Sequence, residues 1–344
     1  MDFTLTEEQR MFADTARTLL ADTCASADLR RLEASGEARD PARWAAIVET
    51  GLASVLLPES AGGIALQELD FALIAEAAGY YALPEPLVES AGVAAPMLAA
   101  VAPDRVLAHP QATFAVQHPV NPFVADADTA AALLLHHEGD VHLVDPDATT
   151  LTREPSLDPF RRLFRVDWTP TSETRIASDP GLWDLTLERG ALFAAAQGLG
   201  LAQRAVDLAV AYAKERTQFG QPIGAYQAVK HHLASAQVRI EFARPVLHAA
   251  AAQLADRDAY SRARVSHAKL AALEAADVAC RTAVQVHGAM GYSWEVDVHY
   301  FLKRALALTF AWGEPAFHRR RVGARVFGRP AGPDQTFARE CAHA

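Results

Sequence analysis

The 344-residue sequence is poor in cysteine, in basic charge and in long apolar runs. Its three cysteines, Cys24, Cys280 and Cys341, are far apart and lack metal-binding or redox spacing, so nothing in them demands an oxidising compartment. The 32 basic side chains are outnumbered by 42 acidic ones, and the net charge of −10 argues against nucleic acid and anionic membranes as partners. Each apolar run is interrupted well short of the roughly 20 residues that a membrane span needs.

The start of the chain also lacks the pattern of a signal peptide. Residues 2–8 are acidic and lead into a predicted helix, so we expect a cytoplasmic protein. His136 and His137 are adjacent in a predicted strand, where neighbouring side chains point to opposite faces. They are therefore poorly placed to chelate a metal together with His142, and we expect no metal site.

Helical periodicity dominates both ends of the sequence. Thr6 and Gln9 have the spacing of a capping box ahead of an amphipathic helix, and a further helix is expected from Leu66 to about Ala78, ending at Gly79. Residues 1–102 therefore predict an N-terminal helical domain. From residue 181 to 344, apolar and small residues recur every three or four positions in four long segments, which predicts a four-helix bundle. Gly198 and Gly200 are expected to let helices approach closely.

The middle of the chain has a different pattern. Short apolar or alternating runs at 113–117, 130–136, 141–144 and 163–168 are separated by Pro, Asp and Gly. Gly139 and Asp140 are expected to form a hairpin turn. Residues 103–180 therefore predict a small β domain, and the fold class is mainly α with three parts.

Residues 211–231, AYAKERTQFGQPIGAYQAVKH, leave one predicted helix, pass through a loop and enter another. Arg216 ends the first helix and Gln227 lies in the first turn of the next, with Gln218 and Phe219 in the loop. A guanidinium, an aromatic face and amides on a rigid loop suit a pyrophosphate joined to an adenine ring. The alternative is an ordinary helix–loop–helix with a salt-bridged arginine.

Residues 283–292, AVQVHGAMGY, form the second informative stretch. A helix is expected to end at Gly288 and the chain to turn through Gly291. The free backbone N–H groups of such a turn suit an anion or a ring edge, and the alternative is a plain helix cap.

Together these strings resemble the two signature loops of the acyl-CoA dehydrogenase family, which dehydrogenates acyl thioesters between Cα and Cβ. The string G-L-x-x-x-L-x-P-E-x-x-G-G at 51–63 resembles its N-terminal domain, while Ala289 replaces a family glycine. In that family the loops grip the adenosine diphosphate part of FAD bound mainly to a neighbouring subunit. The resemblance implies six such FAD contacts here: Arg216, Gln218, Phe219, Gln227, Gln285 and Gly288.

The catalytic base of the family is missing from its expected places. Removal of the α-proton needs a carboxylate over Cα while hydride leaves Cβ for the flavin. The two positions where family members carry this Glu fall on Trp312 and on Gly190. Glu188 lies two residues from the latter, a rotation of about 200° on a helix. Glu314, two residues beyond Trp312, reaches the site only if the register shifts.

The β segment also lacks the family's T-E-P-x-x-G-S-D-like loop and tryptophan strand, so we expect a reduced β domain. A chain that keeps the cross-interface loops but lacks its own site resembles the shorter subunits of bacterial α2β2 acyl-CoA dehydrogenases, including those acting on steroid side-chain CoA thioesters. This resemblance implies a longer homologue as partner, acyl-CoA as substrate and an electron-transfer flavoprotein as electron acceptor. Two alternatives stay open: a self-sufficient homo-oligomer using Glu314 as base, and a non-catalytic scaffold without flavin contact.

Overall fold

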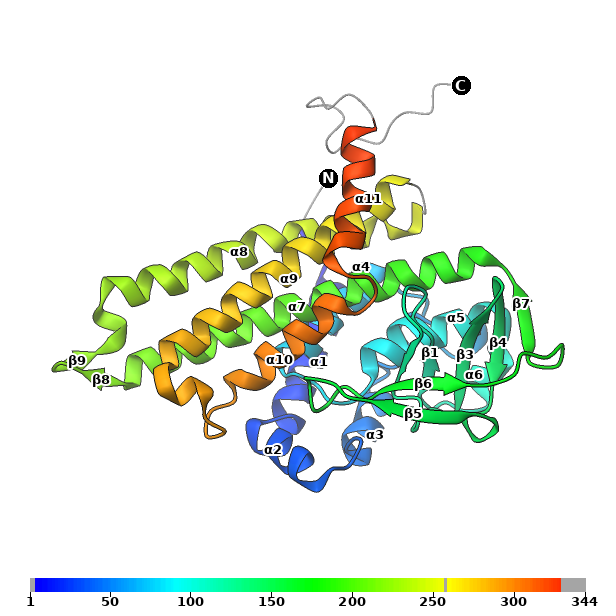
Figure 1. Ribbon diagram of the computed structural model, residues 1–344, viewed down its shortest axis with the longest axis horizontal. Coiled ribbons are helices and arrows are strands. Elements are labelled where there is room, and N and C mark those ends of the chain that lie inside the picture. Colours follow the sequence, from blue (N-terminus) through cyan, green and yellow to red (C-terminus); the bar gives the residue numbers. More distant parts are fainter. Residues whose placement is uncertain (1–3, 257–258, 329–344) are drawn as a thin grey trace.

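The computed structural model describes residues 4–256 and 259–328. Figure 1 shows an elongated molecule in which the long helices α7, α8 and α9 run side by side to a tip formed by β8 and β9. The other strands lie toward the opposite end of the molecule, and the first helices lie beneath its middle. Among the described helices, none combines the length and apolar composition needed to span a bilayer.

The N-terminal part is helical, as predicted, and Thr6 and Gln9 form the expected capping box. The predicted end of one helix at Gly79 is wrong, because that helix continues to Tyr80. Gly79 serves packing instead: a Cβ there would lie 2.1 Å from the carbonyl oxygen of Gln197 on α7. The helices of this part are α1 (Glu7–Thr23), α2 (Ser26–Ser35), α3 (Pro41–Glu49), α4 (Glu68–Tyr80), the π-helix η2 (Leu87–Ala94), α5 (Ala95–Val101) and α6 (Pro103–Leu107).

The β segment forms two small sheets, of order β1-β3-β4-β7 and β2-β6-β5. The hairpin turn lies one residue earlier than predicted. His137 pairs with Asp140, so the turn consists of Glu138 and Gly139, whose φ angles of 50° and 93° are the positive pair that a two-residue hairpin requires. The strands are β1 (Phe114–Val116), β2 (Phe123–Ala125), β3 (Ala132–His137), β4 (Asp140–Val144), β5 (Thr150–Glu154), β6 (Leu163–Asp167) and β7 (Arg175–Ser178).

The four predicted long helices of the C-terminal part are present, and a fifth helix follows them. Gly198 and Gly200 mark close helix contacts, as predicted: a Cβ at Gly200 would lie 1.9 Å from the carbonyl oxygen of Glu76 on α4. The elements of this part are α7 (Pro180–Glu215), β8 (Thr217–Gln218), β9 (Gln221–Pro222), α8 (Gln227–Ala252), α9 (Ala259–His287), α10 (Val298–Phe310) and α11 (Pro315–Phe327). The predicted third domain extends to residue 344, of which 329–344 lie outside the described residues.

Candidate functional site

The first predicted loop is a tight hairpin fixed to the end of α7. The backbone N–H of Arg216 donates to Tyr212 at 2.8 Å, so the arginine caps the helix. Between β8 and β9, Phe219 and Gly220 adopt φ angles of 51° and 83°, again the paired positive values of a two-residue hairpin. The hydroxyl of Tyr226 donates to the carbonyl of Gln218 at 3.1 Å. Backbone hydrogen bonds and the Tyr226 hydroxyl therefore hold the loop, while residues 216–222 are exposed to solvent.

The second predicted loop lies at the same end of the bundle. Tyr212 in the last turn of α7 stacks on His287, the last residue of α9, with ring centroids 4.3 Å apart. Gly288 follows with φ 58°, and a short 3-10 helix, η6 (Gly288–Tyr292), turns the chain. A Cβ at Gly291 would lie 2.6 Å from the carbonyl oxygen of Val284, so this turn requires a glycine. The Tyr212–His287 stack thus brings the two loops together.

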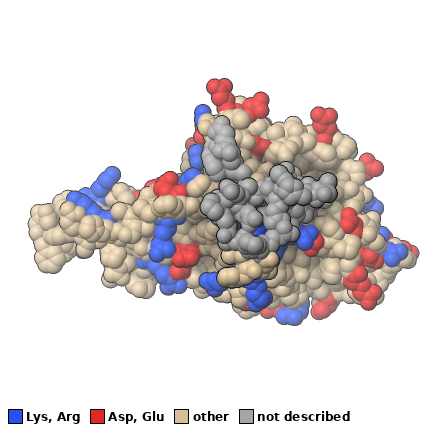
Figure 2. Space-filling model, turned by 90° about the horizontal axis from the view of Figure 1, so that it is seen from above, with Lys and Arg blue, Asp and Glu red and all other residues tan. Residues whose placement is uncertain are grey.

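The predicted cofactor-binding residues all face outward at this end. The Phe219 side chain is 94% exposed, and no ion pair within the described ranges engages Arg216. Figure 2 shows Lys and Arg along the narrow part of the molecule, whereas most visible Asp and Glu lie on the wide part. The other exposed members of the set are Gln218, Gln227, Gln285 and Gly288.

This set of donors fits the distal half of FAD better than the flavin ring. A free guanidinium can bind a pyrophosphate with two parallel hydrogen bonds, amide side chains can bind ribose or adenine edges, and an exposed phenyl ring can stack on a base. Because these groups point away from the protein interior, they suit a cofactor carried by another surface.

The two positions expected for the catalytic base face each other in the interior. Trp312 is 2% exposed, and its indole covers Gly190, where a Cβ would lie 2.1 Å from a ring carbon. The indole stacks on the imidazole of His118 at 3.9 Å, and its Nε1–H donates to Glu89 at 3.3 Å. Neither position can hold a carboxylate in this arrangement.

The two nearby glutamates are directed elsewhere. Glu314 is the N-cap residue of α11, makes no side-chain capping hydrogen bond and is exposed, so its carboxylate lies outside the interior contact between Trp312 and Gly190. Glu188 is buried in an ion pair with Arg321 of α11, and burial raises its pKa. The catalytic role expected for Glu314 therefore stays a prediction.

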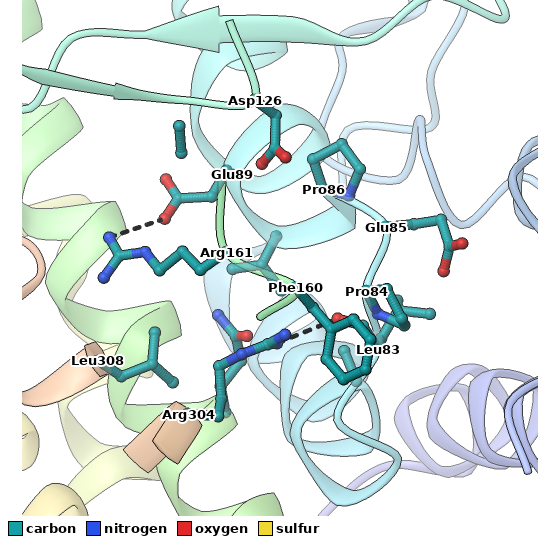
Figure 3. Close-up of a pocket in the computed structure, with 14 residues that line it drawn as sticks. Leu83, Pro84, Glu85, Pro86, Glu89, Asp126, Phe160, Arg161, Arg304 and Leu308 are labelled. Carbon is teal, nitrogen blue, oxygen red and sulfur yellow. Dashed lines mark hydrogen bonds and ion pairs between the residues drawn. The ribbon is translucent and has the colours of Figure 1, made fainter. Parts of the chain in front are cut away.

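Sequence reasoning missed a partly buried charged cluster beside Trp312. Figure 3 shows Glu89, Asp126 and Arg161 around a cavity of about 40 Å³ between the β segment and the helices. Burial opposes charge on Glu89, but His118 and Arg161 hold its pKa below the ordinary value. Burial, with the charge of Glu89, raises the pKa of Asp126 to about 7. Glu89 lies in the otherwise apolar stretch 87–101, and a carboxylate in such a stretch was the one sequence feature that could have indicated this cluster.

The turn that carries Trp312 is tied to α9. Trp312 and Gly313 have φ angles of 55° and 103°. The ammonium group of Lys269 donates to the carbonyls of Ala311 and Gly313, and burial lowers its pKa well below the ordinary value. The imidazole of His318 lies 3.0 Å from the Trp312 carbonyl.

Comparison with known proteins places this architecture in one family. Residues 6–105 match the family model described as "Acyl-CoA dehydrogenase, N-terminal domain", and residues 182–327 match "Acyl-CoA dehydrogenase, C-terminal domain". The chain is 32% identical over 335 residues to acyl-CoA dehydrogenase IpdE2 of Mycobacterium tuberculosis, covering 94% of this chain and 99% of that one. It is likewise 32% identical over 327 residues to IpdE2 of Mycolicibacterium smegmatis, covering 94% and 100%.

Solved structures share the fold along nearly the whole chain. The ChsE4-ChsE5 complex from Mycobacterium tuberculosis superposes with a TM-score of 0.86 at 24% identity, covering 96% of this chain and 100% of that one. The Tcur3481-Tcur3483 steroid ACAD (G363A variant) superposes with a TM-score of 0.84 at 25% identity, covering 93% and 98%. This chain therefore belongs to the acyl-CoA dehydrogenase family, a family of FAD-dependent oxidoreductases that act on acyl-CoA.

Proposed function

We propose that this chain is one subunit of a heteromeric acyl-CoA dehydrogenase and completes the FAD site of a longer homologous partner. The observation that carries the proposal is the outward exposure of Arg216, Phe219 and Gln285 at one end of the bundle. Side chains that served a cofactor of this same chain would face a cavity between its own domains. These face solvent, which suits a cofactor held by another subunit, and the contact of Trp312 with Gly190 at the two base positions favours a different chain as that subunit.

In this assembly the partner supplies the carboxylate that removes the α-proton of the thioester. The bound FAD supplies the acceptor for the hydride from Cβ. The residues of this chain bind and orient: Arg216 neutralises the pyrophosphate, and the amides of Gln218 and Gln285 position the adenosine part. An electron-transfer flavoprotein would serve as the electron acceptor of the assembly.

Two of the similar structures support the proposed α2β2 arrangement and substrate class. The two structures each contain two different proteins: the ChsE4-ChsE5 complex and the Tcur3481-Tcur3483 steroid ACAD. These support a longer homologue as partner and a steroid side-chain CoA thioester as substrate.

The test is co-expression with a longer homologue encoded close to this chain's gene, and measurement of the flavin absorbance at about 450 nm and of the mass of the complex. We expect the chain alone to be colourless and the complex to be yellow and active. Arg216→Ala in the complex should lower FAD occupancy or weaken its affinity about tenfold to hundredfold, whereas Arg216→Lys should lose less. Lys230→Ala, an exposed substitution in the first turn of α8, is the control.

A yellow, active homo-oligomer of this chain that loses turnover with Glu314→Gln would overturn the proposal in favour of a self-sufficient enzyme. A complex in which Arg216→Ala leaves FAD content and affinity unchanged would instead favour a scaffold role. The location of the base is read separately, by replacing the partner's candidate carboxylate with its amide and measuring turnover with FAD still bound.

A further inference from the structure

The indole of Trp312 is recognised on three sides, as a bound ligand would be. One face stacks on His118 with an angle of 27° between the rings. Its six-membered ring lies against Gly190, where even one added carbon would come within 2.1–2.4 Å of three ring atoms. Its N–H edge donates to Glu89. Stacking, close packing against a residue without a side chain and a polar contact at the ring edge are together the features of a small aromatic binding site.

The backbone around this indole is fastened independently of it. Positive φ is unfavourable for a tryptophan, so the turn must be held by its surroundings. His318 provides one hold: its Nδ1 lies 3.0 Å from the Ser266 hydroxyl, and its Nε2 lies 3.0 Å from the Trp312 carbonyl. Since a carbonyl only accepts, Nε2 carries the proton. Burial, reinforced by the charge of Lys269, lowers the pKa of His318 to about 3 and keeps it neutral.

The space filled by the indole, the Trp312 slot, is bounded by His118, Gly190 and Glu89. This slot adjoins the cavity shown in Figure 3. Glu89, which accepts from the indole, lines that cavity with Asp126 and Arg161. One oxygen of Glu89 and both ring nitrogens of His118 are buried without a hydrogen-bond partner among the described atoms, although the carboxylate and the imidazole approach to 3.5 Å. The walls of the slot therefore retain unused polar capacity at Nδ1 of His118, because its Nε2 and the second oxygen of Glu89 face each other.

We propose that Trp312 is a built-in occupant that closes this chain's own acyl site, and that without its side chain the slot binds a planar heteroaromatic ring with an N–H donor. The ligand class follows from the walls: a ring face for His118, a flat edge for Gly190 and a donor for Glu89. The inference rests on the proposed function only where it identifies positions 190 and 312 with those of the family's base. The slot itself is defined by contacts within this chain.

The test uses the full chain with Trp312→Gly, because glycine accepts the positive φ of this turn. Indole is titrated by calorimetry, and its effect on the melting temperature is measured. We expect saturable binding and a rise in melting temperature of several degrees for the variant, and neither for the wild type. Trp294→Gly, which removes an exposed indole, is the matched control and should not respond.

Two further measurements address the polar contact. 1-Methylindole keeps the ring but lacks the N–H, and it should bind at least about tenfold more weakly than indole. In the Trp312→Gly background, Glu89→Gln should weaken indole binding while the affinity for 1-methylindole changes little. Equal affinity for the two rings would overturn the assigned recognition.

If Trp312→Gly does not fold alone, refolding in the presence of indole becomes the measurement. Recovery of native circular dichroism with indole but not with 1-methylindole supports the slot, and no recovery with either overturns it. Trp312→Phe should fold and bind no indole, because a ring still fills the space. None of these readouts depends on FAD or a partner, so they can fail while the Arg216 experiment succeeds, and the reverse.

Discussion

Charges buried beside the Trp312 slot set how single residues respond to pH. Asp126 follows β2 with a φ of 54°, and Figure 3 shows its carboxylate pointing into the cavity, while the carboxylate of Glu89 turns toward Arg161. Arg161 and Arg162 face it with the opposite charge, and Asp128 with the same charge. Burial and the two carboxylates outweigh the two arginines, so the neutral form of Asp126 is favoured.

Asp126→Asn should therefore stabilise the protein at high pH. The pKa of Asp126 is about 7 in the folded chain against an ordinary value of 3.8, so the folded state holds the extra proton between these values. Stability consequently falls as pH rises from about 4 to 7, and the loss is complete above pH 7. Asparagine tolerates positive φ and carries no charge. We expect a gain on the order of 1–3 kcal/mol at pH 8 and little change at pH 4, measured by urea unfolding.

A stability difference between Asp126→Asn and the wild type that is the same at pH 4 and at pH 8 would contradict this reasoning. Asp14→Asn is the control, since Asp14 makes only an exposed pair with Arg17 and should shift stability little at either pH.

Lys269→Met should destabilise the chain without disturbing its surface. Methionine has a similar length but cannot donate, so the buried carbonyls of Ala311 and Gly313 would each lose a partner. We expect a loss of about 2–4 kcal/mol by urea unfolding, since each unsatisfied buried carbonyl costs about 1–3 kcal/mol. The exposed Lys230→Met should lie within about 0.5 kcal/mol of the wild type. A Lys269→Met variant as stable as that control would show that the turn does not depend on the ammonium group.

At the scale of elements, α4 and α7 touch backbone to backbone at two glycines, in addition to the packing of Phe71 on Phe193. Gly79 on α4 meets the backbone of Gln197, and Gly200 on α7 meets the backbone of Glu76. Such contacts allow two helices to touch along their main chains. They place the N-terminal part firmly against the bundle that carries the two loops.

Gly200→Ala should be far more damaging than an alanine at an open helical glycine. Its Cβ would lie 1.9 Å from the carbonyl oxygen of Glu76 and 2.5 Å from the nitrogen of Tyr80, so α4 must move. We expect a loss of about 3 kcal/mol or more. Gly323→Ala on α11 meets only Phe327 at 3.8 Å and should gain up to about 1 kcal/mol from helix propensity. Thermal unfolding of the two variants side by side would decide, and equal melting temperatures would refute the contact.

The sequence predicted elements with regular periodicity and missed those that depend on their surroundings. The long helices α7 to α10 were evident because small and apolar residues recur at helical spacing. The strands β2, β5 and β7 were missed because each is short, and pairing rather than pattern defines them. Helix α2 was hidden in a polar stretch, since only Leu29 and Leu32 of it are buried.

For the site, the sequence predicted local geometry but not long-range contact. The cap at Arg216 and the helix end at Gly288 depend on adjacent residues, so turn chemistry sufficed for both. Trp312 and Gly190 are separated by 122 residues in the sequence, and no local sequence pattern predicts their contact. The FAD contacts themselves stay a prediction.

At the scale of the whole molecule, a buried ion pair connects the β segment to the bundle. Asp158, before β6, pairs with Arg304 of α10, and Arg304 also donates to the carbonyl of Leu83 at 3.1 Å. Nearby Arg161 donates to the carbonyl of Ala307 on α10 at 3.0 Å. These contacts hold three parts of the chain in one arrangement.

The losses of stability from breaking that pair on each side should add up to more than the loss from removing both charges together. Arg304→Met or Asp158→Leu leaves a buried charge alone, with an expected loss of about 3–5 kcal/mol for each. The double variant should be more stable than the sum of the single losses by at least about 1 kcal/mol, because no charge stays uncompensated. A double-mutant cycle by urea unfolding measures this coupling, and strict additivity would show that the pair contributes nothing.

The contact between Trp312 and Gly190 also governs how the chain could change by mutation. A glutamate at 190 collides with the indole, and a glutamate at 312 forfeits the stack on His118 and leaves an acidic side chain next to Glu89. Each single step back toward a base is therefore unfavourable by itself, and the two positions must change together. Under the proposed function, a carboxylate supplied by a partner could therefore not be replaced by a single substitution at either position of this chain.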